Sequence, residues 1–234
     1  MSPLFKLCEH FFSLFFPRLC LACHQQAPPS EHFICIHCQF FLPKTNFHLE
    51  PENGFTEKFW GRVKLQAGAS LYHFTKGGRT QALIHQLKYK GKTKLGYKLG
   101  ELYGRHLLEA PVFSTVDLIV PVPLHPKKKR LRGFNQSELI VRGLSDTMQK
   151  PWTSDILIRK EMTATQTQKN RMDRFENVRQ AFHLVDHDAI HGKHILLVDD
   201  VLTTGATLEA CALVLQEADD VKISMVTIAM ASSK

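Results

Sequence analysis

Short apolar runs alternate with segments of helical periodicity along most of this 234-residue chain. Four runs have the length and composition of buried strands, and they lie at residues 66–74, 116–122, 195–198 and 221–230. Apolar positions recur at helical spacing in residues 79–89, 95–108, 135–148 and 208–215. Strands that are nearly continuous apolar runs, alternating with helices, are typical of parallel sheets that are covered on both faces. The pattern therefore predicts an α/β fold with helices on both sides of a twisted, mostly parallel sheet.

Two shorter apolar runs, residues 155–159 and 181–185, enclose the polar segment 160–180. This segment has almost no apolar periodicity and carries many hydrogen-bond donors. Because a polar segment of this length within a compact domain is usually functional, we expect either a loop that closes over a site or a disordered segment.

Residues 1–20 are rich in apolar side chains and resemble a weak signal peptide. However, Cys8, Glu9 and His10 interrupt the apolar run, and no small-residue cleavage site follows it. We therefore expect a short amphipathic helix that packs on the rest of the protein. No segment reaches 18 consecutive apolar residues, so the sequence predicts no membrane span and a cytoplasmic protein.

An acidic pair and a loop of small hydroxyl residues follow the strand at residues 195–198. The pair is Asp199 and Asp200, and the loop then contains Thr203, Thr204, Gly205, Ala206 and Thr207. Backbone N–H groups, threonine hydroxyls and a helix N-terminus suit a phosphate, and Gly205 permits close backbone approach. Carboxylates accept hydrogen bonds and suit sugar hydroxyls. The alternative is a strand followed by a capped helix with no ligand, but the combination favours a site for phosphate and ribose.

A basic loop follows the strand at residues 116–122, after a proline-rich turn. Five cations lie in residues 127–132, including Lys129, Arg130 and Arg132, and they make up much of the net charge of +8 and the pI of about 9.2. Ligands of open α/β sheets bind at the carboxyl ends of strands, so we expect the loop to meet pyrophosphate or another anion. A solvated charged surface and contact with nucleic acid are the alternatives.

Four of the six cysteines form two Cys-x-x-Cys pairs that are separated by eleven residues. The pairs are Cys20 with Cys23 and Cys35 with Cys38, and together they supply the four thiolates of a closed tetrahedral zinc site. A redox-active pair is the alternative. The spacing predicts a structural Zn²⁺ that supplies the folding free energy of a module too small to bury a core of its own.

Three motifs together carry a resemblance to a known family. VDDVLTTGAT at residues 198–207 is similar to the motif by which type I phosphoribosyltransferases bind phosphoribosyl pyrophosphate (PRPP). RGFNQ occupies residues 132–136, and Thr163, Gln166, Arg174 and Asn177 precede an Ala-Phe pair at residues 181–182. With the cysteine pairs, the chain resembles the ComF/GntX family of competence-associated, phosphoribosyltransferase-like proteins.

The resemblance implies a division of the chain into two parts. Residues 1–50 would hold the N-terminal segment and a four-cysteine zinc ribbon. Residues 51–234 would form a type I phosphoribosyltransferase fold, with a hood from about residue 60 to about residue 110. Type I transferases often form dimers, so a homodimer is expected by analogy.

The resemblance also implies roles for the motifs. Asp199 and Asp200 would bind the ribose hydroxyls of PRPP, residues 203–207 its 5′-phosphate, and Lys129, Arg130 and Arg132 its pyrophosphate. Residues 160–180 would be a flexible loop that closes over the site through Gln166, Arg174 and Asn177, with Arg174 also a catalytic residue at the leaving pyrophosphate. Mg²⁺ would be held mostly by oxygens of the ligand and of water.

Two functions of different classes fit these features. The first is a phosphoribosyltransferase that acts on PRPP, in DNA uptake or nucleotide-linked metabolism, with its acceptor unassigned. The second is a catalytically silent scaffold that binds single-stranded DNA or a competence helicase through the zinc ribbon and the basic loop.

Overall fold

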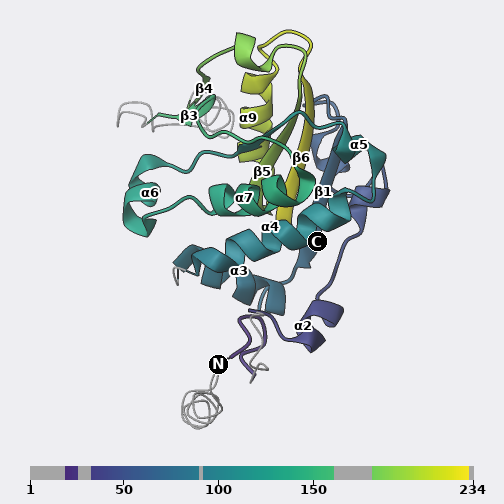
Figure 1. The fold of residues 1–234 in the computed structure, drawn as a ribbon, viewed down its shortest axis with the longest axis vertical. Coiled ribbons are helices and arrows are strands. Elements are labelled where there is room, and N and C mark those ends of the chain that lie inside the picture. Colours follow the sequence, from purple (N-terminus) through teal and green to yellow (C-terminus); the bar gives the residue numbers. More distant parts are fainter. Residues whose placement is uncertain (1–18, 26–32, 90–91, 161–180, 232–234) are drawn as a thin grey trace, which may run out of the picture.

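A parallel sheet stands at the centre of the computed structural model, which describes residues 19–25, 33–89, 92–160 and 181–231. The order of its strands is β1-β6-β5-β2, and every neighbouring pair is parallel (Figure 1). The strands are β1 (Ala67–Phe74), β2 (Leu118–Pro121), β5 (His194–Leu202) and β6 (Lys222–Ala231). These strands confirm the four predicted apolar runs.

Helices cover both faces of this sheet (Figure 1). One face carries α4 (Thr93–Leu107) and α7 (Gln136–Met148), and the other carries α9 (Ala206–Leu215). The remaining helices are α2 (Ile36–Phe41), α3 (Arg79–Tyr89), α5 (Pro111–Ser114), α6 (Pro126–Arg132), and the short 3-10 helices η1 (Phe47–Leu49), η2 (Thr56–Phe59) and η4 (Asp188–Ile190). The predicted α/β architecture is therefore confirmed.

Strand β5 supplies side chains to both layers of the core. Leu196 and Val198 belong to the apolar cluster on the side of α4 and α7, whereas Ile195 and Leu197 belong to the cluster on the side of α9. This alternation follows from the two-residue period of a strand. All four side chains are fully buried, which explains why the run has no polar position.

The acidic pair lies within β5, not after it. The sequence predicts a strand that ends at residue 198, but β5 continues to Leu202. The neighbouring strand causes this extension, because β6 stays in register beside β5 as far as Met230, the partner of Leu202. The backbone of β5 is therefore paired with β6 both before and after Asp199 and Asp200, which fixes the backbone of the pair.

A second, antiparallel sheet of two short strands lies beside the main one (Figure 1). It consists of β3 (Leu157–Arg159) and β4 (Phe182–Leu184), which confirms the two shorter apolar runs. Arg159 pairs with Phe182, so the two ends of the intervening segment meet. The predicted flexible-loop residues Gln166, Arg174 and Asn177 lie outside the described residues.

The basic segment is a helix, so the prediction of a basic loop is wrong. Helix α6 begins with Pro126, whose ring fixes φ at a helical value, and the side chain of His125 accepts a hydrogen bond from the Lys127 N–H. Gly133 ends the helix with φ +80° and donates its N–H to the Lys129 carbonyl. Local capping outweighs the repulsion between the neighbouring cations.

The four-cysteine module packs against the same apolar cluster as α3 and α4. Ala22, Ile34 and Leu42 join this cluster together with Leu83 of α3 and Leu95 of α4. The predicted division of the chain near residue 50 stays a prediction, as does the N-terminal helix, which with Cys8 falls outside the described residues. In the part of the chain that the structure describes, no helix has the length and apolar character needed to cross a membrane.

Candidate functional site

A cavity of about 480 Å³ opens where β2 and β5 end, bounded by α3, α6 and α7. Its wall combines residues of strands β1, β3 and β5 with residues of these three helices. The polar and charged residues of its wall are Gln81, His85, Lys88, Tyr89, Lys128, Arg132, Asn135, Gln136, Ser137, Arg159, Asp199, Asp200, Thr203 and Thr207. The structure thus brings the acidic pair, part of the threonine loop and part of the basic helix to one cavity.

The two carboxylates of the acidic pair contact different helices. Asp199 Oδ1 accepts hydrogen bonds from the Ser137 hydroxyl at 3.1 Å and from the Asp200 N–H at 2.8 Å. Asp200 Oδ1 lies 3.1 Å from the ammonium of Lys88 on α3. Helix α7 thus contacts one carboxylate and α3 the other.

The carboxyl group of Asp199 is a weaker acid than an ordinary aspartate. Burial and the neighbouring charge of Asp200 raise its pKa from 3.8 to about 7, against the opposing effects of the Asp200 N–H, Lys88 and Ser137. Two adjacent carboxylates in a partly dry site cannot both ionise freely. Near neutral pH, the Asp199 carboxyl is therefore partly protonated, so it can both accept and donate hydrogen bonds.

The threonine loop ends in a glycine turn at the start of α9. Gly205 has φ +87° and is the N-cap of α9, so the N-cap residue itself supplies no capping side chain. Thr203 and Thr204 are exposed, and the Thr204 hydroxyl accepts a long hydrogen bond of 3.5 Å from the Ala206 N–H. A Cβ at Gly205 would lie 3.1 Å from the Phe59 ring, so the turn requires glycine for space as well as for conformation. Free N–H groups at the N-terminus of a helix suit a phosphate.

The RGFNQ motif shapes the opposite wall of the cavity. Asn135 is the N-cap of α7: its side-chain oxygen accepts the Ser137 N–H at 3.2 Å, and its amide donates to the Val122 carbonyl at 3.0 Å. This fixes Ser137 under the carboxylate of Asp199. The motif thus positions a residue that contacts the acidic pair.

The predicted pyrophosphate residues divide between two cavities. Arg132 lines the main cavity and stacks on the Tyr89 ring of α3 at 5.1 Å. Lys129 and Arg130 instead line a neighbouring cavity of about 370 Å³, and Lys129 forms a 3.0 Å ion pair with Glu138. Helical spacing accounts for the division, because Lys128 and Arg132 are four residues apart and share one face of α6, whereas Pro126 shares a second face with Lys129 and Arg130. Lys128, which the sequence analysis did not single out, faces the main cavity.

Two further donors in the main cavity were missed by the sequence analysis. Among the residues that the structure describes, the buried Nε of Arg159 on β3 has no hydrogen-bond partner, and neither has the buried amide nitrogen of Gln136. Burial lowers the pKa of Arg159, while the charges of Cys211 and Asp199 raise it. Buried unpaired donors are costly, so both favour an acceptor-rich ligand. The position of Arg159 at the end of a strand was the signal that could have identified it.

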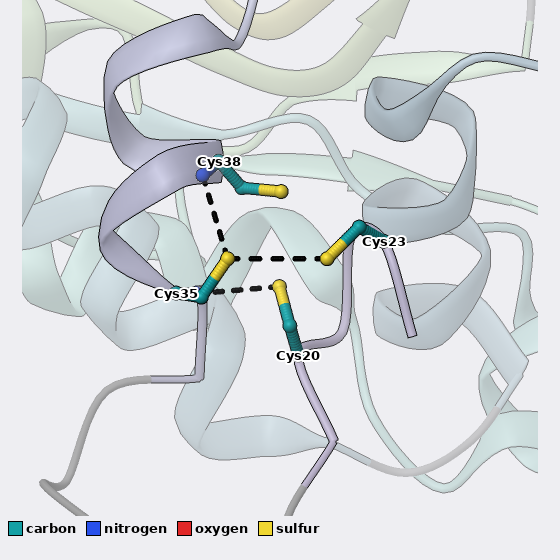
Figure 2. A group of neighbouring side chains, drawn as sticks. All are labelled: Cys20, Cys23, Cys35 and Cys38. Carbon is teal, nitrogen blue, oxygen red and sulfur yellow. Dashed lines mark hydrogen bonds between the residues drawn. The ribbon is translucent and has the colours of Figure 1, made fainter. Parts of the chain in front are cut away.

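The four predicted zinc ligands come together as one group. Their sulfur atoms lie within 4.8 Å of one another, and Cys23 Sγ is 3.9 Å from Cys35 Sγ (Figure 2). Zinc–sulfur bonds of about 2.3 Å place tetrahedral thiolates ~3.8 Å apart. The Cys35 N–H donates to Cys20 Sγ at 3.3 Å, and the Cys38 N–H lies 3.5 Å from Cys35 Sγ. The group can therefore hold a metal ion.

The electrostatics of the group favour a thiolate. Burial raises the pKa of Cys20, but N–H donors from Cys35, Cys23 and Ala22 outweigh it and lower the pKa to about 7. Burial raises the pKa of Cys38 far above its ordinary value, and the neighbouring sulfur atoms raise it further. Four thiols this close do not ionise together without a cation to compensate them.

Comparison with curated proteins places the chain in a family, although no protein-family model matches it. The DNA utilization protein YhgH of Escherichia coli (strain K12) is 31% identical over 211 residues, which cover 88% of this chain and 87% of that protein. Competence protein F of Haemophilus influenzae is 34% identical over 113 residues, 48% of this chain and 47% of that protein. Competence protein ComFC of Bacillus subtilis is 32% identical over 100 residues, 43% of this chain and 38% of that protein. The chain belongs to the ComF family.

This ComF-family chain is less similar to solved structures than to its curated relatives. A glutamine PRPP amidotransferase from B. subtilis aligns with a TM-score of 0.39 and 22% identity, over 56% of this chain and 25% of that chain. A hypoxanthine phosphoribosyltransferase from Staphylococcus aureus aligns with a TM-score of 0.35 and 14% identity, over 56% of this chain and 60% of that chain. The predicted fold class instead rests on the parallel sheet, its flanking helices and the four-cysteine group.

Proposed function

We propose that this ComF-family protein binds PRPP together with Mg²⁺ and transfers the phosphoribosyl group to an acceptor. The observation that carries the proposal is the meeting of the acidic pair, the threonine loop and several cations around one cavity of about 480 Å³. A phosphorylated sugar with a pyrophosphate substituent needs these three kinds of partner. The acceptor side of the reaction stays unassigned.

Each wall of the cavity has a role in this proposal. Asp199 and Asp200 accept hydrogen bonds from the ribose hydroxyls, and residues 203–207 donate to the 5′-phosphate. Arg132 and Arg159, with Lys128, meet the pyrophosphate. Mg²⁺ would neutralise part of the pyrophosphate charge, held mainly by oxygens of the ligand and of water and supported by the acidic pair.

The reaction would be a displacement at the anomeric carbon. The bond from this carbon to the pyrophosphate oxygen breaks, the electron pair leaves with pyrophosphate, and a lone pair of the acceptor forms the new bond. Arg132 and Arg159 stabilise the negative charge that develops on the leaving group. Side chains of the hood, such as Lys88 and Tyr89, limit access of water to the same cavity.

Calorimetry with PRPP and Mg²⁺ tests the proposal. The wild-type chain should bind PRPP, Asp199→Asn and Asp200→Asn should each weaken binding at least tenfold, and Asp219→Asn, an exposed residue away from the cavity, should not. Loss of one charged hydrogen bond of about 1.5–3 kcal/mol accounts for such a factor. Absence of binding at roughly millimolar PRPP, or equal binding by all four proteins, would overturn the proposal.

A second candidate function is contact with single-stranded DNA. The relatives YhgH and competence protein F are named for DNA utilization and competence. Helix α6 supports this candidate: none of its residues is buried, and it lies at an edge of the molecule (Figure 1). Such a helix suits the phosphate backbone of a nucleic acid or an acidic partner such as a helicase.

Salt-dependent binding of an oligonucleotide tests this candidate. Replacing Lys127, Lys128 and Lys129 with Gln should weaken binding and flatten its salt dependence. Replacing Lys92, Lys94 and Lys98, at and within α4, removes the same number of exposed charges and is the matched control. If the chain binds no single strand at low salt, or if both sets of variants bind alike, the DNA contact is excluded.

We also infer that the four-cysteine group holds a structural Zn²⁺. Four sulfur ligands leave no open position, so the ion ties two segments of chain together and performs no chemistry. Reduced cysteines of this kind are usual in the cytoplasm, which we propose as the location of the protein.

A further inference from the structure

A second group of metal-binding side chains lies outside the cavity and the four-cysteine module. His48 of η1, His106 in the last turn of α4 and Glu109 just after it come together, although 61 residues separate the first from the last. One ligand atom from each lies within 4.8 Å of the other two. The group bridges the segment that follows the cysteines and the end of a hood helix.

The geometry of the group fits a small transition-metal ion. His48 Nε2 is 3.5 Å from Glu109 Oε2, and His106 Nδ1 is 3.2 Å from Glu109 Oε1. A tetrahedral ion with bonds of about 2.0–2.2 Å to nitrogen and oxygen has ligand atoms ~3.3 Å apart. The two distances end on different oxygens of Glu109, so the carboxylate would have to bind the ion through both oxygens, or turn so that one oxygen serves both histidines. The rings of His48 and His106 lie 5.7 Å apart and are tilted, which leaves space between them.

The chemistry of the three donors narrows the class of ion. Two imidazoles with one carboxylate suit Zn²⁺ and its first-row neighbours, not Mg²⁺ or Ca²⁺, which prefer oxygen ligands. The same set with an open fourth position is found in zinc sites that keep a water. The Glu109 side chain is 53% exposed, whereas that of His48 is 5% exposed, so one side of the group faces solvent and the other faces protein.

Surrounding charge limits the affinity of the group. Lys44 lies close enough to act on His106 electrostatically, and its charge opposes a cation. Glu109 supplies the compensating negative charge. We therefore expect an affinity for Zn²⁺ below that of four thiolates, in the range of a regulatory or labile site.

We propose that His48, His106 and Glu109 form a second, open transition-metal site that fastens η1 to the end of α4. The binding of an ion there links the chain just after the cysteine module to the hood. The site is independent of PRPP binding, since its residues do not line the cavity of the acidic pair. It requires no chemistry beyond the exchange of water on the ion for protein ligands.

Zinc stoichiometry of the full-length chain tests the proposal. After equilibration with Zn²⁺ and desalting, His106→Gln and Glu109→Gln should each bind one equivalent less than the wild type, or bind it at least tenfold more weakly. His187→Gln, an exposed histidine elsewhere, is the matched control and should retain it. These variants change half-buried or exposed side chains, and circular dichroism checks that each is folded.

A structural measurement separates this site from surface binding by other histidines. X-ray absorption of the additional equivalent should show nitrogen and oxygen ligands without sulfur, and Zn²⁺ should raise the unfolding temperature of the wild type above that of His106→Gln. If both Gln variants bind as much Zn²⁺ as the wild type, or if the difference between them and the wild type lies in sulfur-bound zinc, the proposal is wrong.

Discussion

The ammonium of Lys88 lies 3.1 Å from a carboxylate oxygen of Asp200, so helix α3 contacts the acidic pair directly. The Lys88 side chain is 24% exposed and that of Asp200 is 11% exposed, so the contact is shielded from much of the solvent. Partly shielded pairs are screened less by salt than surface pairs. Any ligand whose hydroxyls contact Asp200 must share this carboxylate with Lys88 or displace it.

Removal of this cation should make Asp199 a weaker acid. The charge of Lys88 lowers the pKa of Asp199, so Lys88→Met should raise it above about 7. Carbon-13 NMR of the aspartate carboxyls across a pH titration would measure the change. Lys98→Met, which removes the partner of Glu101 on α4, should leave the Asp199 titration where it is. An unchanged or lower value in Lys88→Met would contradict the electrostatic interpretation.

Stability should depend on pH through Asp199. Its pKa rises from 3.8 to about 7 on folding, so the folded state binds the extra proton and gains stability that is fully present below pH 3.8. This contribution is lost as pH rises through about 7. Relative to Asp199→Asn, which has no such proton, the wild type should lose up to about 1.4 kcal/mol per pH unit within this window.

Urea unfolding of both proteins at several pH values measures this difference. The difference in unfolding free energy should level off above about pH 8, where the group is ionised in both states. A difference that does not vary between about pH 5 and about pH 8 would show that the carboxyl titrates normally.

Substitution of Gly205 should damage the turn at the start of α9. An L-residue in the left-handed region costs about 1–2 kcal/mol, and here a new Cβ would also press on the Phe59 ring. Gly205→Ala should therefore lower the free energy of unfolding more than Gly192→Ala does. Gly192 has φ +67° but no atom within 4 Å of a Cβ, so the comparison isolates the clash. Equal losses in the two variants would mean that Phe59 moves aside freely.

Loss of the zinc group should weaken the docking of the module on the hood. Cys38 is fully buried within the apolar cluster that contains Leu83 and Leu95, so Cys38→Ser should release one equivalent of Zn²⁺ and lower the unfolding temperature. An ion present at a hundredfold excess over its Kd contributes about 2.7 kcal/mol. Cys211→Ala removes a buried cysteine of α9 and should retain the ion. Full zinc content in Cys38→Ser would exclude the four-cysteine site.

Features that depend on neighbouring residues in the sequence were predictable. The apolar run before Asp199 predicts β5, and the two cysteine pairs predict a common metal group, because both signals arise within a few residues. The basic helix was misjudged because its periodicity is hidden by a run of like charges. Its caps at His125 and Gly133 were the local evidence against a loop.

Features that depend on tertiary proximity were not predictable in this way. The place of Arg159 at the end of a strand suggests a ligand site, but nothing in the sequence near it indicates that Asp199 acts on its charge. His48 and Glu109 meet only because η1 packs beside the end of α4. Lys128 and Lys129 line different cavities, and this could not be predicted without knowing that the segment is helical.

Lys88 couples both members of the acidic pair to helix α3. Its ammonium lies 3.1 Å from Asp200, and its charge also lowers the pKa of Asp199. Ser137 of α7, in contrast, contacts Asp199 directly. Under the proposed function, sequence changes at the end of α3 would therefore alter both carboxylates that hold the ribose, so related proteins could differ in the ligand they accept through this one helix.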